Sequence, residues 1–166
     1  MMLSQEEVIE RLRLEPLPLE GGYFRRTYEN TRPIDLGKGF KQPLGTAIYF
    51  LLTPDSFSAL HFLKEDEVYH FYLGDPVQLY ELAPDGILQE TILSSRLDEG
   101  HQVQYPVYAN RWHGSRLVSG GNWALLGTTM APGFAWEDFV LGNRKELTSS
   151  YPKHKQLITE LTREQN

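Results

Sequence analysis

The sequence contains no cysteine, and this absence excludes two kinds of site. Without thiols the chain can form no disulfide framework, and no thiolate can ligate a metal ion. The sequence also lacks any apolar run that approaches the length of a membrane span. Internal repeats, low-complexity segments and linkers are absent as well.

The chain has fewer basic than acidic residues. The chain has 16 Lys and Arg against 22 Asp and Glu, which gives a net charge of −6. An acidic chain repels polyanions, so the charge argues against a nucleic acid partner and favours a soluble protein. The first residues, MMLSQEEVIERL, read as a polar helix rather than a signal peptide. We therefore expect no membrane association and a cytoplasmic location.

A length of 166 residues fits one domain with a substantial core, so we predict a single domain over residues 1–166. Residues 21 to about 141 are typical of an all-β fold. Short runs rich in Tyr, Phe, Val, Thr and Leu alternate there with Gly, Pro, Asn and Asp, and the helices that a parallel sheet needs are absent. A sandwich or barrel follows. The predicted strands are Tyr23–Tyr28, Thr46–Leu52, Ser58–Leu63, Val68–Leu73, Val77–Leu82, Leu88–Leu93, Gln102–Val107, Arg116–Ser119, Trp123–Met130 and Glu137–Leu141.

A short helix is predicted at each end of this β core. Ser4 and Glu7 have the spacing of a capping box, and apolar residues follow at helical spacing up to about Leu14. Near the other end, Pro152 fits the first turn of a helix that continues to about Glu164.

Two of the predicted strands are apolar on both faces. The run 47–52 does not alternate, and the run 68–73 barely does. One face of a sandwich sheet covers the core, so a second apolar face needs a cover of its own. We predict that a second copy of the chain provides it in a homodimer. The alternative is that the terminal helices cover this face.

The stretch Ser58–Gly74, SALHFLKEDEVYHFYLG, carries the main candidate site. His61 precedes Glu67 by six residues, and His113 follows in the segment YANRWHGS. Each lies at the edge of a predicted strand, where a barrel can bring the three together. Two imidazoles and one carboxylate suit proton transfer, or a divalent metal such as Fe, Mn, Ni or Zn.

The alternation of side chains along a strand divides the residues that follow Glu67. If Glu67 faces the cavity, Tyr69 shares its face and His70 points the other way, toward an interface or a second layer. Glu67 is the last charge before an apolar strand. A carboxylate carried inward beside a histidine would have a strongly tuned pKa.

Further side chains are candidates for the pocket. Tyr49 and Tyr69 offer hydroxyl groups that could return a proton, and aromatic side chains at a barrel mouth suit a flat or ring-shaped ligand. Arginines could pair with an anionic group of the ligand. The candidate ligand-binding residues are His113, Trp112, Arg25 and Arg116, with Arg26 as a further arginine.

The spacing resembles the cupin superfamily. The first cupin motif contains His-x-His, three or four residues, Glu, six residues and Gly. His61, Glu67 and Gly74 match it, whereas Leu63 stands at the position of the second histidine. The resemblance implies a metal set of His61, Glu67 and one histidine from the second motif.

The second cupin motif, Pro-x-Gly-x-x-His, aligns with the segment that ends at His113. Tyr108 stands in place of Pro and Asn110 in place of Gly, and Asn tolerates the left-handed backbone that such a Gly adopts. Nearly the whole chain is similar to one branch, the compact cupins of unknown function found in bacteria, fungi and plants. The segments that carry this likeness are Glu20–Tyr28, Thr46–Leu52, Asp66–Pro76, Gly114–Leu117 and Ala131–Phe139. The resemblance implies a double-stranded β-helix jelly roll, usually dimeric, with a ligand-sized cavity.

Three functions remain open at this point. The first is an enzyme that acts on a small polar metabolite such as a sugar or nucleotide derivative, with acid–base chemistry like that of the cupin sugar-nucleotide epimerases. There His61 or Glu67 would abstract a proton and Tyr49 or Tyr69 would return one. The second is a metal-dependent cupin that uses His61, Glu67 and His113. The third is a ligand-binding module without catalysis.

Overall fold

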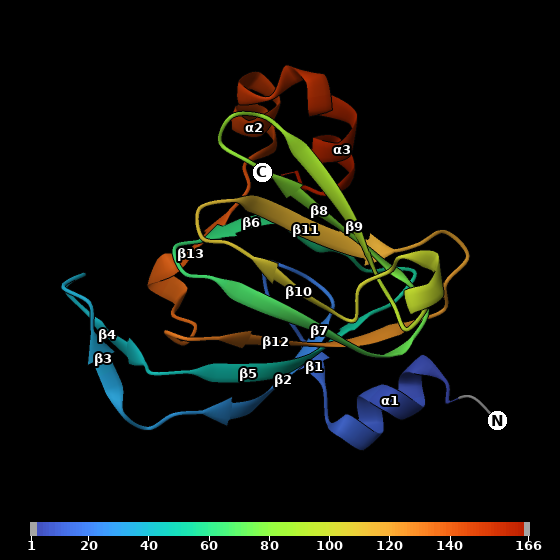
Figure 1. The fold of residues 1–166 in the computed structure, drawn as a ribbon, viewed down its shortest axis with the longest axis horizontal. Coiled ribbons are helices and arrows are strands. Elements are labelled where there is room, and N and C mark those ends of the chain that lie inside the picture. Colours follow the sequence, from blue (N-terminus) through green and yellow to red (C-terminus); the bar gives the residue numbers. More distant parts are fainter. Residues whose placement is uncertain (1–2, 165–166) are drawn as a thin grey trace.

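The computed structural model describes residues 3–164, which form two facing antiparallel sheets and a separate hairpin (Figure 1). The six-stranded sheet has the order β1 (Glu15–Pro16), β2 (Tyr23–Glu29), β5 (Thr46–Leu52), β12 (Ala124–Met130), β7 (Glu67–Gly74) and β10 (Gln104–Val107). The five-stranded sheet has the order β13 (Phe139–Leu141), β6 (Ser58–Leu63), β11 (Trp112–Leu117), β8 (Val77–Leu82) and β9 (Leu88–Leu93). The hairpin consists of β3 (Pro33–Asp35) and β4 (Lys41–Pro43).

The order of the strands makes this a double-stranded β-helix jelly roll. From β5 to β13 the chain crosses repeatedly from one sheet to the other, so that β12 pairs with both β5 and β7, and β11 with both β6 and β8. The predicted all-β fold with short terminal helices is confirmed. Residues 1–2 and 165–166 of the predicted domain lie outside the described residues.

The helices cover the outer faces of the two sheets (Figure 1). The helix α1 (Gln5–Leu12) begins with the predicted capping box between Ser4 and Glu7, and it packs beneath the six-stranded sheet. The helices α2 (Arg144–Ser150) and α3 (Lys155–Glu160) cover the five-stranded sheet. Among residues 3–164, no helix is long and apolar enough to cross a membrane.

The C-terminal segment is more broken than the sequence predicts. A 3₁₀ turn (Pro152–His154) precedes α3, which ends at Glu160 rather than near Glu164. The helix α2 was not predicted at all. Its sequence, RKELTSS, buries only Leu147 and therefore has no hydrophobic periodicity to indicate a helix.

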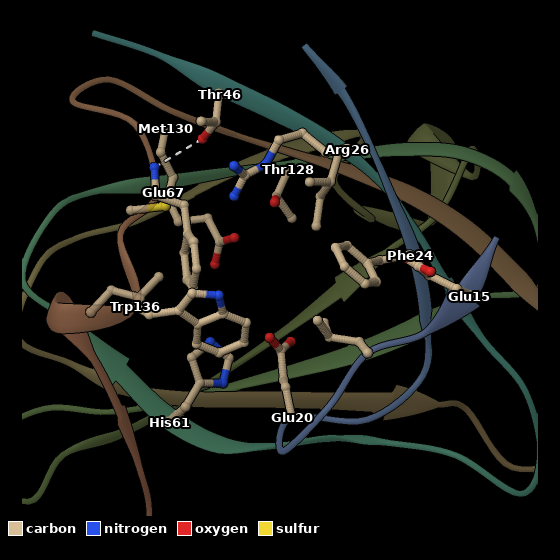
Figure 2. A pocket seen from close by; sticks show the side chains of 14 residues that line it. Glu15, Glu20, Phe24, Arg26, Thr46, His61, Glu67, Thr128, Met130 and Trp136 are labelled. Carbon is tan, nitrogen blue, oxygen red and sulfur yellow. Dashed lines mark hydrogen bonds between the residues drawn. The ribbon is translucent and has the colours of Figure 1, made fainter. Parts of the chain in front are cut away.

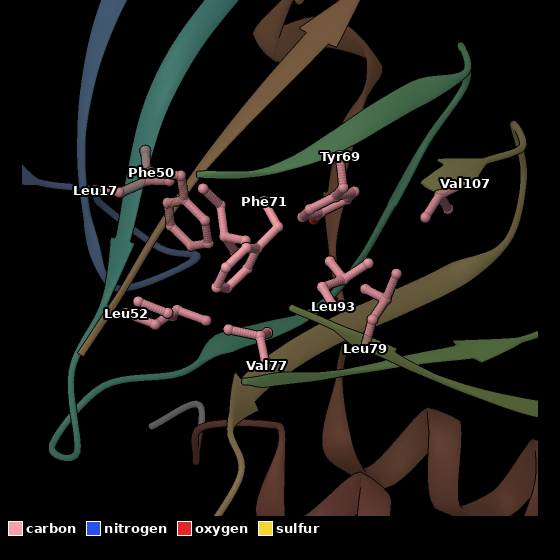
Figure 3. Packing of buried hydrophobic residues seen from close by; sticks show 11 residues of the cluster. Leu17, Phe50, Leu52, Tyr69, Phe71, Val77, Leu79, Leu93 and Val107 are labelled. Atoms are coloured by element: carbon pink, nitrogen blue, oxygen red, sulfur yellow. The ribbon is translucent and has the colours of Figure 1, made fainter. Parts of the chain in front are cut away.

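The apolar core fills one end of the space between the sheets. Along β5, Phe50 and Leu52 lie in this core, whereas Thr46 and Ile48, on the same inner face, line a cavity at the other end. The inner face of β5 thus runs from the core at one end to the cavity at the other. Figure 3 shows the packing of the cluster, which contains Leu17, Phe50, Leu52, Tyr69, Phe71, Val77, Leu79, Leu93, Val107, Ala124 and Leu126.

One strand differs from its prediction in a way that matters for the site. The strand β11 begins at Trp112, four residues before the predicted start at Arg116. The reason is Gly114, which sits within the strand where β6 approaches closely. A Cβ at this position would lie 2.8 Å from the carbonyl oxygen of Ser58. His113 is therefore a strand residue and not part of a turn.

Candidate metal centre and ligand cavity

The two sheets bring His61, Glu67 and His113 together, as the sequence predicts. His61 on β6 and His113 on β11 are cross-strand partners, and their ring centroids lie 4.1 Å apart. Glu67 opens β7 in the facing sheet. One ligand atom from each residue lies within 4.8 Å of the other two, and all three side chains are buried.

Backbone hydrogen bonds fix the orientation of both imidazoles. His61 Nδ1 lies 2.8 Å from the carbonyl oxygen of Ala59, and His113 Nδ1 lies 3.1 Å from that of Arg111. A carbonyl only accepts hydrogen bonds, so each Nδ1 must carry the proton. Each Nε2 is then left with a lone pair. Histidines that ligate metals usually have their other ring nitrogen held in this way.

The contact between His113 and Glu67 calls for a positive charge. His113 Nε2 lies 3.2 Å from Glu67 Oε2. With its only proton on Nδ1, a neutral ring would present a lone pair to a carboxylate, which is an unfavourable contact between two acceptors. Either a second proton on His113 or a metal cation at this point removes the conflict. These residues therefore fit a divalent cation.

The two histidines differ in pKa, because burial dominates at His61 whereas Glu67 dominates at His113. Burial, followed by the nearby charge of His113, lowers the pKa of His61 to about 3, so this ring stays neutral, as a metal ligand must. Burial also acts against the charged form of His113, but the hydrogen bond to Glu67 outweighs it and raises the pKa of His113. The pKa of Glu67 is lowered, because the hydrogen bond and charge of His113 overcome the opposing effect of burial.

A cavity of about 370 Å³ adjoins this cluster (Figure 2). It has aromatic walls from Phe24, Phe134 and Trp136, and polar groups elsewhere. This size and composition suit a small molecule with both an apolar and a polar part. The other lining residues are Glu15, Leu17, Glu20, Arg26, Thr46, Ile48, His61, Leu63, Glu67, Thr128 and Met130.

Glu20 reaches the cavity from a loop whose backbone is unusual. Leu19, Gly21 and Gly22 all have positive φ angles, of 66°, 105° and 73°. A Cβ on Gly21 would lie 2.5 Å from a backbone oxygen, so this position requires glycine. The Arg163 guanidinium donates to the carbonyl oxygens of Leu19 and Glu20 and holds the loop in place. Such strained backbone is often found at functional sites.

The carboxyl group of Glu20 has an environment that favours its neutral form. Burial, and then repulsion by Glu67, raise the pKa of Glu20 from 4.5 to about 7, although Ser58 donates a hydrogen bond to its Oε1 at 2.7 Å. A carboxyl group that titrates near neutral pH is suited to donate or accept a proton.

Comparison with known proteins shows the family of the chain. A family model described as "Cupin superfamily (DUF985)" matches residues 6–142. The chain belongs to this family, Cupin_5. Two solved structures match it over their whole length with a TM-score of 0.91 and 30% identity: a hypothetical protein from Leishmania major, which covers 98% of this chain, and a protein from Shewanella oneidensis, which covers 99%. In both cases the match spans 100% of the other chain.

More distant cupins share the fold of this Cupin_5 chain. A mutant of oxalate decarboxylase from Bacillus subtilis matches with a TM-score of 0.55 and 12% identity, over 92% of this chain and 38% of its own. At this identity the likeness shows the fold alone. No curated protein is detectably similar to the chain.

Tyr49 and Arg25 do not reach the cavity, contrary to the sequence-based prediction. On β5, Ile48 and Phe50 face inward, so Tyr49 points to the outer face of the sheet. Its ring packs edge-on against Tyr72, with centroids 6.1 Å apart, and the Arg25 guanidinium lies 5.5 Å from its centroid. Tyr49 therefore cannot return a proton to a ligand in the cavity.

Trp112 and Arg116 also point away from the cavity, toward the C-terminal helices. They lie on the outer face of β11, because His113 occupies the inner face. Trp112 packs against Phe62, with ring centroids 5.4 Å apart. Arg116 pairs with Glu160 of α3 at 2.8 Å. Neither residue lines the cavity, so neither can contact a ligand that is bound there, contrary to the sequence-based prediction of pocket residues.

Tyr69 and His70 lie on opposite faces of β7, as the alternation rule predicts. Tyr69 is buried beside Glu67 and His113 but does not line the cavity, and burial and the Glu67 charge raise its pKa well above 10. His70 lies on the outer face, where its Nε2 is 2.9 Å from Thr129 Oγ1.

The sequence analysis assigned no role to Glu20, and it named Arg26 only as a further arginine beside the candidate ligand-binding residues Arg25 and Arg116. Arg26 lines the cavity because it shares the inner face of β2 with Phe24. A signal for Glu20 was present in the two glycines that follow it, since paired glycines often mark a strained backbone next to a ligand. The sequence alone does not indicate which way such a loop points.

Proposed function

We propose that this Cupin_5 protein binds a divalent metal ion through His61, Glu67 and His113, and a small polar metabolite in the adjoining cavity. The observation that carries the proposal is the convergence of the three ligand atoms within 4.8 Å. Both Nδ1 atoms are already engaged by backbone carbonyls, so both Nε2 atoms are available as ligands. Two nitrogens and one carboxylate suit Fe, Mn, Ni or Zn.

A bound metal ion would act as a Lewis acid toward an oxygen atom of the metabolite. The residues of the chain have separate tasks. His61 and His113 hold their Nε2 lone pairs toward Glu67, and the aromatic side chains of the cavity limit access of water. Glu20 can hold or release a proton at a carboxyl oxygen on the cavity wall.

Metal content is the test of this proposal. Protein prepared without an affinity tag or chelator should contain close to one divalent ion per chain by elemental analysis. Mn is the first ion to test by reconstitution, because the structurally similar oxalate decarboxylase has Mn(II) centres. Protein that contains no metal, and takes up no Mn²⁺ or Zn²⁺ in equilibrium dialysis, would contradict the proposal.

A second candidate is a metal-independent enzyme with acid–base chemistry of the isomerase or epimerase type. The specific observation in its favour is the His113–Glu67 contact of 3.2 Å, which a protonated His113 can make without a metal ion. Glu20 would replace Tyr49 as the second acid–base group. Turnover of a sugar nucleotide by metal-free protein would support this candidate. Saturable binding without any product would instead support a binding module.

We also propose that the chain forms a homodimer through the outer face of the six-stranded sheet. The helix α1 covers only one end of this face, and His70 and Tyr72 remain partly exposed, with stacked rings 6.4 Å apart. The hydroxyl end of the Tyr72 ring lies over Gly127, where a Cβ would be 2.3 Å from the hydroxyl oxygen. A flat aromatic surface of this kind suits a partner sheet.

Placing a charge on this face should dissociate the dimer. Tyr72→Glu would bury two symmetry-related carboxylates in the interface, so we expect dimer affinity to fall at least about tenfold. The matched control is Ile87→Glu, an exposed apolar residue before β9 in the other sheet. Light scattering coupled to size exclusion should give twice the chain mass for the wild type and the control, and a lower mass for Tyr72→Glu. An equal mass for all three variants would refute the proposed interface.

A further inference from the structure

Outside the candidate metal cluster, the described lining of the cavity has one arginine, Arg26, and two carboxyl groups, Glu15 on the exposed rim and Glu20. We propose that the ligand is a small carboxylate, whose charged group is bound by Arg26 and hydrogen-bonded by Glu20. The inference rests on the proposed function only in taking this cavity as the ligand site. It does not require a bound metal.

Arg26 is placed to meet an anionic group. It is the one Arg or Lys among the described residues that line the cavity, and its guanidinium points into it from β2 (Figure 2). One of its nitrogens pairs with Glu29, which leaves further N–H groups for a ligand. A guanidinium matches the planar geometry of a carboxylate and can bind both of its oxygens.

Glu20 offers a hydrogen bond from another part of the cavity wall. Its Oε1 accepts from Ser58, which is the one side-chain hydrogen bond of this carboxyl group within residues 3–164. The charged groups that face it are Glu67 from β7, His113 from β11 and Arg163 from the C-terminal segment. Since its pKa is about 7, Glu20 carries a proton in a large fraction of molecules at neutral pH and can donate it in a hydrogen bond.

The proton on Glu20 should couple ligand affinity to pH. An ionised Glu20 would repel a carboxylate, whereas a protonated Glu20 donates a hydrogen bond to it. Binding of a carboxylate therefore favours uptake of one proton. Above the pKa of Glu20, the affinity should therefore fall as pH rises, because the ligand then meets an ionised carboxylate.

The apolar part of the ligand has a wall of its own. Phe24, Phe134 and Trp136 line the cavity, and the rings of Phe134 and Trp136 meet edge to face with centroids 5.0 Å apart. A planar ring fits such surroundings. Benzoate is therefore the probe of choice, and benzamide is its neutral counterpart of nearly equal size.

The first arm of the experiment compares two adjacent arginines. Binding is followed through the indole N–H signal of Trp136, assigned with a Trp136→Phe variant, in EDTA-treated and in Zn²⁺-loaded protein. We expect benzoate to bind more tightly than benzamide, and Arg26→Ala to weaken benzoate binding about tenfold. Arg25→Ala, which removes the same charge from the outer face, should leave benzoate binding unchanged.

The second arm compares two carboxylates between pH 6 and pH 8.5. In the wild type, benzoate affinity should fall with rising pH. Glu20→Gln keeps a hydrogen-bond donor at every pH, so its affinity should be nearly independent of pH. Glu15→Gln, which removes a charge from the exposed rim of the cavity, should retain the wild-type pH dependence.

Three results would overturn the inference. They are benzamide binding as tightly as benzoate (or no benzoate binding at all), equal effects of Arg26→Ala and Arg25→Ala, and a wild-type pH dependence in Glu20→Gln. Failure of the metal proposal would look different. Elemental analysis would then find no metal, while the EDTA-treated protein would still report on Arg26 and Glu20.

Discussion

Replacing His61 by alanine should abolish metal binding by this chain. His61 supplies one of only three candidate ligand atoms among the described residues, and its neutral Nε2 is held toward Glu67 and His113 by the hydrogen bond to Ala59. Loss of an outer-shell partner alone typically reduces metal affinity 10–100-fold, so loss of a ligand should reduce it by at least about 100-fold. Elemental analysis and calorimetric titration with Mn²⁺ or Zn²⁺ would measure the change.

His70→Ala provides a matched control for this substitution. His70 lies on β7, the strand that carries Glu67, but on the outer face, where it contacts Thr129 and Gln104. This variant should retain full metal content. Because His61 is buried, circular dichroism and a thermal unfolding curve must show that His61→Ala is folded before its metal content is compared. A folded His61→Ala protein that binds metal like the wild type would refute the assigned site.

The site residues that could be predicted were those that lie on or next to a strand whose alternating side chains show which face is buried. His61 and Glu67 flank one turn, and the alternation along β7 correctly separated Tyr69 from His70. Tyr49 could not be placed in the same way. The strand β5 is apolar on both faces, so alternation does not tell which of them is the inner one.

The same ambiguity between the two faces of a strand explains why the sequence did not show which of Arg25 and Arg26 faces the cavity. Arg25 and Arg26 are adjacent on β2, and only the pairing of β2 with β5 decides that Arg26 faces the cavity. Glu20 lies in a loop without any period, where long-range contacts to Ser58 and Arg163 determine its direction. Such contacts are not visible in the sequence.

The fold itself was largely predictable because turn residues separate its strands. The runs of β5, β6, β8 and β9 have the predicted bounds. The start of β11 was misplaced because Gly114 reads as a turn residue, whereas it actually allows the backbone of β6 to approach.

Replacing Glu20 by glutamine should stabilise the protein at alkaline pH, although Glu20 lies at the proposed ligand site. In the folded chain Glu20 keeps its proton up to a pKa of about 7, whereas the unfolded chain loses it near 4.5. Between these values the folded state binds more protons than the unfolded state. Stability therefore falls as pH rises through this window, and above pH 7 the full loss remains.

The size of the effect follows from the same shift. A rise in the pKa of Glu20 from 4.5 to about 7 corresponds to a loss of about 3 kcal/mol in folding stability, at about 1.36 kcal/mol per pKa unit. Access of solvent to the cavity reduces this loss to about 2 kcal/mol. Glutamine has no proton to lose, and its amide oxygen can still accept from Ser58. Urea unfolding in EDTA should thus give Glu20→Gln a free energy of unfolding about 2 kcal/mol higher than that of the wild type at pH 8. At pH 5 the difference should be less than about 1 kcal/mol.

Glu15→Gln separates this effect from a general change in charge. Both substitutions remove one negative charge from the cavity, but Glu15 is exposed and makes no contact that holds it in a buried position. Its stability should stay within about 0.5 kcal/mol of the wild type at both pH values. If Glu20→Gln were instead less stable than the wild type at pH 8, the Glu20 carboxylate would be a stabilising group. The near-neutral pKa that underlies its proposed role in ligand binding would then be wrong.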